Sequence, residues 1–196
     1  SLTTDAGGTV AINGGVVNTT GAQSYGEAAT LGATTTLTST GSGDITFGST
    51  LNGAQTLAVN TSGVTTFTGA VGGTTALTSL TTDTNGSVVI RGGLIKTTAA
   101  QTYNKAVSLG ADTLLQGVNV AMLSTVNGAF GLTVNDSGTT VLGGVVGGVL
   151  PRSVRRGLCV GTSRWLWLWR AAAERLRADP RAGCSAPVRP PRAGRA

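Results

Sequence analysis

The sequence predicts an all-β protein, a right-handed parallel β-solenoid (β-helix) with coils of about 20 residues. Three observations predict this fold: a long internal repeat, a shorter spacing inside it, and short runs of alternating apolar and polar residues separated by glycine-rich turns. The composition changes near residue 150 of the 196. We therefore expect a solenoid repeat region over residues 1–150, and over residues 151–196 a basic, Arg/Pro/Trp-rich tail that is outside the solenoid and partly helical or disordered.

The long repeat has two copies. The sequence Leu-Thr-Thr-Asp at residues 2–5 recurs at residues 80–83, and Tyr25 recurs as Tyr103, both at an offset of 78. Farther along the chain the offset is 75, so the second copy has lost three residues near positions 117–122. Because the pattern survives this loss, it favours a stack of modules whose loops absorb differences in length.

A shorter interval of 20 residues separates Leu31 from Leu51 and Leu51 from Val71, and the same interval separates Phe47 from Phe67. Four units of this size fill the long repeat, so we expect four coils in each copy. About seven coils would form a stack about 35 Å tall, at about 4.8 Å per coil. Parallel stacking places like residues in continuous interior columns. The interval therefore predicts that Leu31, Leu51 and Val71 lie in one column.

The local chemistry agrees with short strands and tight corners. Residues 45–47, 57–59 and 132–134 alternate apolar residues with Thr or Ala, as half-buried strands do. Asn-Gly at residues 52–53 tolerates the positive φ that a corner needs. No proline precedes Pro151, as expected for strands that donate hydrogen bonds on both sides.

Charge is divided unevenly along the chain. Residues 1–150 hold three basic and six acidic residues, whereas the remaining basic residues of the 14 lie in the tail, so the solenoid region shows no basic surface for a nucleic-acid partner. The chain has no histidine, and both cysteines, Cys159 and Cys184, lie in the tail, which removes the usual general base and metal ligands. We expect no cofactor, no metal site and, because no apolar run reaches about 18 residues, no membrane span.

The few charged residues of the region have simpler explanations than catalysis. Arg91, Lys96 and Lys105 stand where the first copy has two asparagines and a glutamate, so we interpret them as solvent-facing substitutions. Asp5 and Asp83 occupy matched positions, which could suggest periodic calcium ligands, but the dense ligand pattern of calcium-binding β-rolls is missing. We expect both aspartates to cap turns, and we assign no catalytic, cofactor-binding or metal-binding residue.

The motifs resemble a known kind of repeat. Gly-Ala-Gln-(Ser/Thr) at residues 21–24 and 53–56, Thr-Tyr at residues 102–103, and Leu-Thr-Thr-Asp are similar to the β-strand repeats of filamentous-haemagglutinin-like exoproteins and autotransporter-type adhesins. The resemblance covers about residues 1–150. It implies a structural or adhesive, non-enzymatic segment of a large secreted protein that forms a fibre on the bacterial cell surface.

The resemblance also implies where such a chain acts. The expected partners are a host or neighbouring-cell surface or extracellular matrix, reached through the parent fibre. End-to-end self-association is expected for another reason: an out-of-frame tail would leave the last coil without the polar cap that such stacks need. Because the chain begins at Ser1 inside a repeat, we expect a longer parent protein with a secretion leader upstream.

Three other functions remain open. Threonine-rich segments such as residues 34–36 and 65–66 could form an ice-binding face, although such a face would repeat Thr-x-Thr at one place in every coil. A carbohydrate-binding solenoid is the second alternative. The third is a polysaccharide-active β-helix enzyme, which would need a base, a nucleophile and an orienting group in one pocket.

The tail is interpreted as out-of-frame translation without an evolved function. Reading the expected high-GC codons of residues 154–158 one base later can spell Ser-Asp-Ala-Gly, nearly the start of a third repeat, close to where that repeat is due. The competing interpretation is an amphipathic helix over residues 164–179, with Trp165, Trp167 and Trp169 at a membrane interface. Tryptophans at alternate positions suit a strand better than one helical face.

Overall fold

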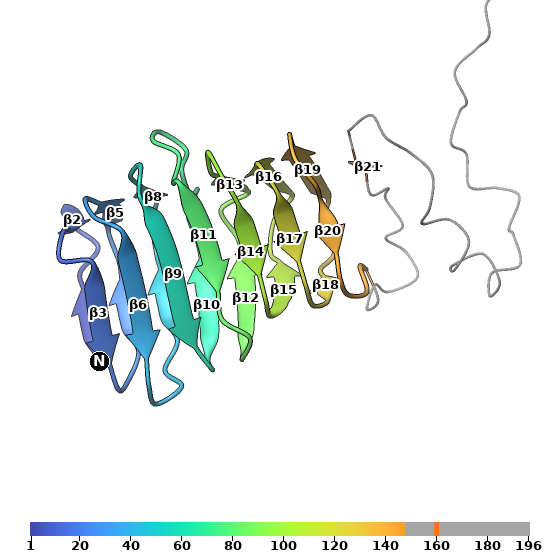
Figure 1. Ribbon diagram of the computed structural model, residues 1–196. Coiled ribbons are helices and arrows are strands. Elements are labelled where there is room, and N and C mark those ends of the chain that lie inside the picture. Colours follow the sequence, from blue (N-terminus) through green and yellow to red (C-terminus); the bar gives the residue numbers. More distant parts are fainter. Residues whose placement is uncertain (148–158, 161–196) are drawn as a thin grey trace, which may run out of the picture. The chain divides into compact units, whose positions relative to one another are not determined.

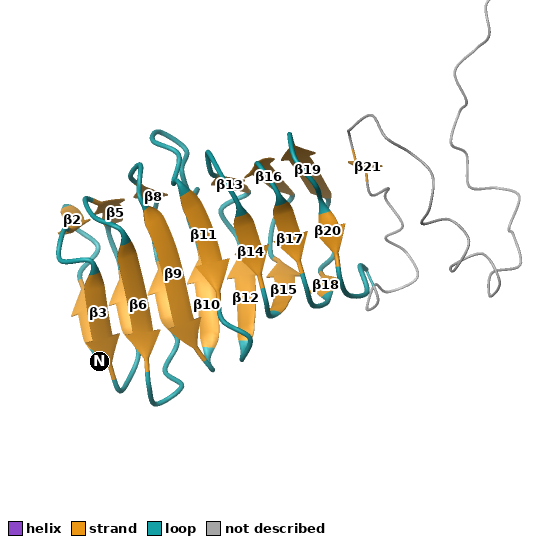
Figure 2. Ribbon diagram, in the orientation of Figure 1, coloured by secondary structure: helices purple, strands orange, loops and turns teal. Residues whose placement is uncertain are grey.

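The computed structural model describes residues 1–147 and Cys159–Val160, and these residues form a parallel β-solenoid without helices (Figures 1 and 2). Each coil runs through three sides. Two sides each form a seven-stranded sheet, and the remaining side has a three-stranded and a four-stranded sheet connected by bridges at Val71. By contacts the chain divides into the units Ser1–Thr162 and Ser163–Ala196. The expectations for the tail lie outside the described residues, except at Cys159–Val160.

The strands of each side are stacked in chain order. Side 1 contains β1 (Leu2–Thr4), β4 (Gln23–Tyr25), β7 (Ile45–Phe47), β10 (Val64–Phe67), β12 (Ser87–Ile90), β15 (Ala106–Leu109) and β18 (Val126–Asn127). Side 2 contains β2 (Thr9–Ile12), β5 (Ala28–Leu31), β8 (Leu51–Asn52), a single bridge at Val71, then β13 (Leu94–Lys96), β16 (Thr113–Gly117), β19 (Leu132–Asp136) and β21 (Cys159–Val160). Side 3 contains β3 (Val16–Thr19), β6 (Thr35–Ser39), β9 (Thr56–Thr61), β11 (Ser79–Thr82), β14 (Gln101–Tyr103), β17 (Val120–Met122) and β20 (Val141–Leu142).

Alternation along each strand builds the core. In β9 the buried residues are Leu57, Val59 and Thr61, and the residues between them are half-buried. Successive side chains of a strand point to opposite faces, so one set fills the interior of the coil and the other faces outward. The predicted pairing of Phe47 with Phe67 is confirmed, and Tyr25 extends the same column with stacked rings whose centroids lie 5.1 and 5.6 Å apart.

The predicted column of Leu31, Leu51 and Val71 is wrong in its first member. Leu51 pairs with Ala29 on one side and with Val71 on the other, whereas Leu31 pairs with Ile12. The cause is that the coil from Ala29 to Leu51 contains more residues than the regular interval of the sequence predicts. All three residues are nevertheless buried in the same core.

In the coil after Leu31, the residue beside it is Gly53, so no side chain continues the column of Leu31 there. Gly53 has φ of +126°, and a Cβ atom there would collide with the Leu31 carbonyl oxygen. We expect Gly53→Ala to lower the free energy of unfolding by about 1–3 kcal/mol, because both the backbone strain and the collision must be relieved. Urea unfolding followed by circular dichroism measures this loss.

Gly14→Ala is the matched control for Gly53→Ala. Gly14 is exposed, has no left-handed φ, and a Cβ atom there would meet nothing within 4 Å. Its cost is expected to stay within about 0.5 kcal/mol. Equal costs for the two substitutions would contradict the close approach of coils at Gly53.

The sequence repeat does not correspond to four coils. Strand β1 lies on side 1, but its copy in the second repeat, β11, lies on side 3; β4 and its copy β14 show the same shift. From the start of one copy to the start of the next, the chain therefore completes three full coils and two of the three sides of a fourth coil. The reason is that the coils differ in length: on side 1 the longest step joins Val64 to Ser87, and a much shorter one joins Ser87 to Ala106. The second copy is thus turned by one side around the solenoid axis.

Candidate functional site

A buried glutamine makes the same set of hydrogen bonds in both copies of the repeat. Gln23 is fully buried and donates its amide Nε2 to the carbonyl oxygens of Val17 (3.2 Å) and Thr38 (2.9 Å) and to Thr19 Oγ1 (3.2 Å). Its Oε1 accepts the hydroxyl hydrogen of Tyr25 at 3.0 Å. The side chain thereby satisfies its own polar atoms and joins two successive coils at the corner between sides 3 and 1.

The second copy rebuilds this group at another corner. Gln101 Nε2 donates to the carbonyl oxygens of Ile95 (3.2 Å) and Gln116 (2.8 Å) and to Thr97 Oγ1 (3.3 Å), and Tyr103 donates to Gln101 Oε1 at 3.0 Å. These contacts lie between sides 2 and 3. Burial raises the pKa of Tyr25 to about 12 and that of Tyr103 still further, so both phenols stay protonated donors at physiological pH. The recurrence of Gln-x-Tyr at residues 23–25 and 101–103 was the available sequence signal for this network.

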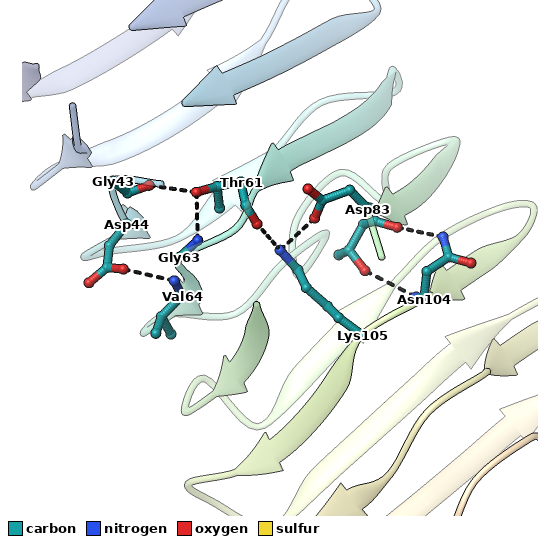
Figure 3. A network of polar contacts seen from close by, with 9 residues as sticks. Gly43, Asp44, Thr61, Gly63, Val64, Asp83, Asn104 and Lys105 are labelled. Carbon is teal, nitrogen blue, oxygen red and sulfur yellow. Dashed lines mark hydrogen bonds and ion pairs between the residues drawn. The ribbon is translucent and has the colours of Figure 1, made fainter. Parts of the chain in front are cut away.

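Lys105 is the charged residue that sequence analysis placed wrongly. Its side chain is fully buried, and its ammonium lies 2.8 Å from Asp83 Oδ1 and 3.1 Å from the carbonyl oxygen of Thr61 (Figure 3). Thr61, Asp83 and Lys105 belong to three successive coils of the stack. The solvent-facing interpretation of Lys105 is therefore wrong, because the side chain runs along the stack into the interior instead of outward.

The two matched aspartates have different roles. Asp5 accepts the N–H of Gly7 at 3.3 Å, which confirms the turn cap expected there. Asp83, in contrast, is the ion-pair partner of Lys105, so the same assignment for Asp83 is wrong. The difference follows from residue 27, which is glutamate in the first copy where the second copy has Lys105.

Other acidic and amide side chains connect one coil to the next. Asp44 accepts the N–H of Val64 at 2.7 Å (Figure 3), and Asp112 accepts that of Gly131 at 2.7 Å. Asn119, the counterpart of Asp44, accepts the N–H of Thr139 at 3.0 Å. Since each partner lies one coil further along the stack, these groups stabilise corners of the solenoid.

Asp136 is a buried carboxylate surrounded by donors. It accepts hydrogen bonds from the N–H groups of Asn119 (2.8 Å), Val120 (3.0 Å) and Gly138 (2.8 Å), and from the Thr140 hydroxyl (2.9 Å). Burial alone would raise the pKa of this carboxyl, but these four hydrogen bonds outweigh burial and lower it below the ordinary value of 3.8.

This lowered pKa makes stability depend on pH. A carboxyl with a lower pKa in the folded than in the unfolded state contributes stability above the unfolded value and loses it as the pH falls through the folded value. We expect Asp136→Asn to cost about 1–3 kcal/mol at pH 7, because Asn cannot accept every one of these hydrogen bonds. The measurement is urea unfolding of both proteins from pH 7 to pH 2.

The difference between wild type and Asp136→Asn should shrink below about pH 4, where the unfolded carboxyl begins to bind its proton. Asp112→Asn is a suitable control, because Asp112 is exposed and its hydrogen bond with the N–H of Gly131 is open to water. A constant difference across this pH range would show that the charge of Asp136 carries none of the effect.

The remaining cations are dispersed over the solenoid. Arg91 is exposed after β12, and Lys96 is half-buried at the end of β13. Within residues 1–147 the structure contains one ion pair, Lys105–Asp83, and no group of three or more metal-ligating side chains. The structure therefore brings Lys105 and Asp83 together, whereas Arg91, Lys96 and Asp5 form no ion pair with them within residues 1–147.

The outward positions of side 3 form a mixed column. In register order it consists of Val16, Thr36, Ala58, Thr81, Thr102, Ala121 and Val141. Threonine occupies three of these seven positions, and apolar residues occupy the rest. A regular Thr-x-Thr array is therefore missing from this described face.

No family model, curated protein or solved structure matches this chain. In the part of the chain that the structure describes, no helix is long and apolar enough to cross a membrane.

Proposed function

We propose that this chain is a structural segment of a secreted bacterial surface fibre, whose solenoid holds other parts of the parent protein away from the cell. In this role the chain catalyses no reaction, and any adhesion to host cells, neighbouring cells or matrix involves the parent fibre. The proposal fits the resemblance to filamentous-haemagglutinin-like and autotransporter-type repeats.

The observation that carries the proposal is a difference between the inward and the outward positions of the two copies. Apolar inward positions stay apolar, as in Ile12 and Ile90, and Gln23 recurs as Gln101; these residues keep their burial although the second copy is turned by one side. The identity of an inward residue can still change, as Phe47 does to Met122. Several outward positions change: Asn13 becomes Arg91, Asn18 becomes Lys96, Ser24 becomes Thr102, Thr30 becomes Ser108 and Thr36 becomes Leu114. Others are kept, such as Thr3 as Thr81 and Asn60 as Asn135.

A binding or catalytic surface repeated along a fibre would need its outward residues kept and aligned on one side. This chain keeps the apolar character of its packing residues, and the turn between copies moves even outward residues that are kept, such as Thr3 and Thr81, to different sides. Such a pattern supports a function that depends on the rod and on no particular surface residue.

The experiment is protease treatment of intact cells of the organism that carries the gene. An epitope inserted at the exposed turn of Gly41 and Ser42 should be removed before the cells are lysed. A cytoplasmic protein should be preserved in the same sample. Protection of the epitope until lysis would contradict the proposed location at the cell surface.

A further inference from the structure

Asparagine is followed directly by glycine at Asn13, Asn52, Asn85 and Asn127. Asparagine is a chemically labile residue. It is most labile before glycine, because glycine has no Cβ atom to keep its backbone nitrogen away from the asparagine side chain. Asn52, Asn85 and Asn127 lie inside the stack, where each has a described coil before it and after it.

The reaction of an Asn-Gly pair needs no enzyme. The backbone nitrogen of the glycine attacks Cγ of the asparagine and gives up its hydrogen, and the side-chain nitrogen leaves as ammonia. The product is a cyclic succinimide, which water opens to aspartate or isoaspartate. The side chain must therefore be free to turn toward the glycine nitrogen, that nitrogen must not be held in a hydrogen bond, and water must reach the site.

Asn52 is held by hydrogen bonds on both sides of the reacting bond. Its Oδ1 accepts the N–H groups of Thr74 at 3.0 Å and Thr75 at 3.2 Å. The nitrogen that would attack, that of Gly53, donates its hydrogen to the carbonyl oxygen of Thr75 at 3.2 Å. The reaction at Asn52 can therefore begin only after these hydrogen bonds are broken.

Asn127, the copy of Asn52 in the second repeat, is protected by burial. Its Oδ1 is buried, so water does not reach the amide. The glycine that follows it, Gly128, lies so close to Leu109 in the preceding coil that even a Cβ atom would collide with the Leu109 carbonyl oxygen. The side chain and backbone therefore have no room for the rotation that the reaction needs.

Asn85 differs from both of them. It lies with Thr84 and Gly86 in the corner between β11 and β12, and all three residues are exposed. Within residues 1–147 no hydrogen bond engages the Asn85 side chain or the N–H of Gly86. Both reacting groups are therefore free and hydrated in the folded protein.

The core of the solenoid holds this corner at both ends. Before it, Asp83 Oδ1 lies 2.8 Å from the buried ammonium of Lys105 (Figure 3). After it, Ser87 donates its N–H to the carbonyl oxygen of Gly63 at 3.3 Å, and a Cβ atom on Gly86 would collide with that same oxygen. Asn85 is thus exposed without any unfolding of the neighbouring strands.

We propose that Asn85 is a site of spontaneous deamidation in the folded protein, with water as the reactant and an aspartyl or isoaspartyl residue as the product, whereas the fold protects Asn52 and Asn127. The product carries a negative charge two residues from Asp83, the partner of Lys105. An isoaspartyl residue also lengthens the main chain beside Gly86, where the close contact with Gly63 leaves little room. The protein therefore changes with age at one corner of the solenoid.

The experiment is incubation of the full chain in mildly alkaline buffer under reducing conditions, with one sample native and the other unfolded in urea. Peptide mass spectrometry after digestion at mildly acidic pH follows the conversion of each amide to a carboxyl. In the native sample Asn85 should react about tenfold faster than Asn52 and Asn127, or more, because protected residues react only through local opening. In urea the three should react at similar rates, since each precedes glycine.

Asn85→Gln is the matched control, because it keeps the exposed amide but would have to close a larger ring. Residue 85 of this variant should stay unmodified in both samples. Loss of its amide would show direct hydrolysis without the Gly86 nitrogen and would contradict the mechanism.

The proposal is overturned if Asn85 reacts no faster than Asn52 and Asn127 in the native protein. It is equally overturned if Asn85 keeps its full lead in urea, since the local sequence and not the fold would then decide the rates. The reaction does not depend on where the protein is located, so its failure leaves the proposed function to be judged by the protease experiment.

Discussion

Replacing Asp83 with alanine is expected to lower the free energy of unfolding by about 3–5 kcal/mol, the cost of leaving a buried charge without its partner. The side chain of Lys105 is 0% exposed, so water cannot replace the lost carboxylate. The carbonyl oxygen of Thr61, at 3.1 Å, would be the acceptor that remains. Urea unfolding followed by circular dichroism measures the loss.

The two halves of the ion pair should not be equivalent. Lys105→Met leaves Asp83, whose side chain is 24% exposed and can be partly hydrated, so its cost should be smaller than that of Asp83→Ala. The double substitution should recover part of the loss, since no unpaired charge remains. Asp5→Ala is the matched control, because Asp5 is exposed and caps a local turn. A smaller cost for Asp83→Ala than for Lys105→Met would contradict the burial of the lysine.

Phe47→Ala should also cost about 3–5 kcal/mol, the range for removing a buried aromatic side chain. Phe47 is 1% exposed and stacks on Tyr25 and Phe67 in the coils before and after it. Its removal takes away two ring contacts and leaves a cavity in the core. The same urea unfolding measurement applies.

Thr46→Ala provides the comparison for Phe47→Ala, because Thr46 lies in the same strand, β7, and points to the opposite, outward face. Its cost is expected to stay within about 0.5–1 kcal/mol. If the two substitutions in β7 cost the same, the interior aromatic column does not stabilise the stack in the way described.

Several features of the fold could be predicted from sequence because they depend on neighbours along the chain. Alternation in residues 45–47 and 57–59 marks the strands β7 and β9, and Phe47 pairs with Phe67 as their spacing indicated. Glycine at residue 53 marks a corner with positive φ. The three residues that the second copy lacks near 117–122 are missing from the loop after Gly117. The hydrogen bonds of Gln101 repeat those of the first copy before this loop, and the hydrogen bond of Asn119 repeats that of Asp44 after it.

The candidate site could be predicted much less well. Lys105 was interpreted as exposed because it replaces a glutamate, which is sound for an outward position but fails for a residue that follows β14 at a corner. Its partner Thr61 lies 44 residues earlier in the chain, beyond the reach of any local pattern. Glutamine is usually a surface residue, and the burial of Gln23 is explained only by its four hydrogen bonds at the corner between two sides of the solenoid.

Strand alternation, turn residues and repeats involve residues that are close along the chain, and they were sufficient to predict a stack of parallel coils built from two copies of one module. Which strands pair, on which side each copy lies and which charges are buried became known from the three-dimensional arrangement alone. Those outcomes depend on loop lengths summed around each coil: the longer coil from Ala29 to Leu51 moved Leu31 out of its predicted column, and the sum over one repeat turned the second copy by one side.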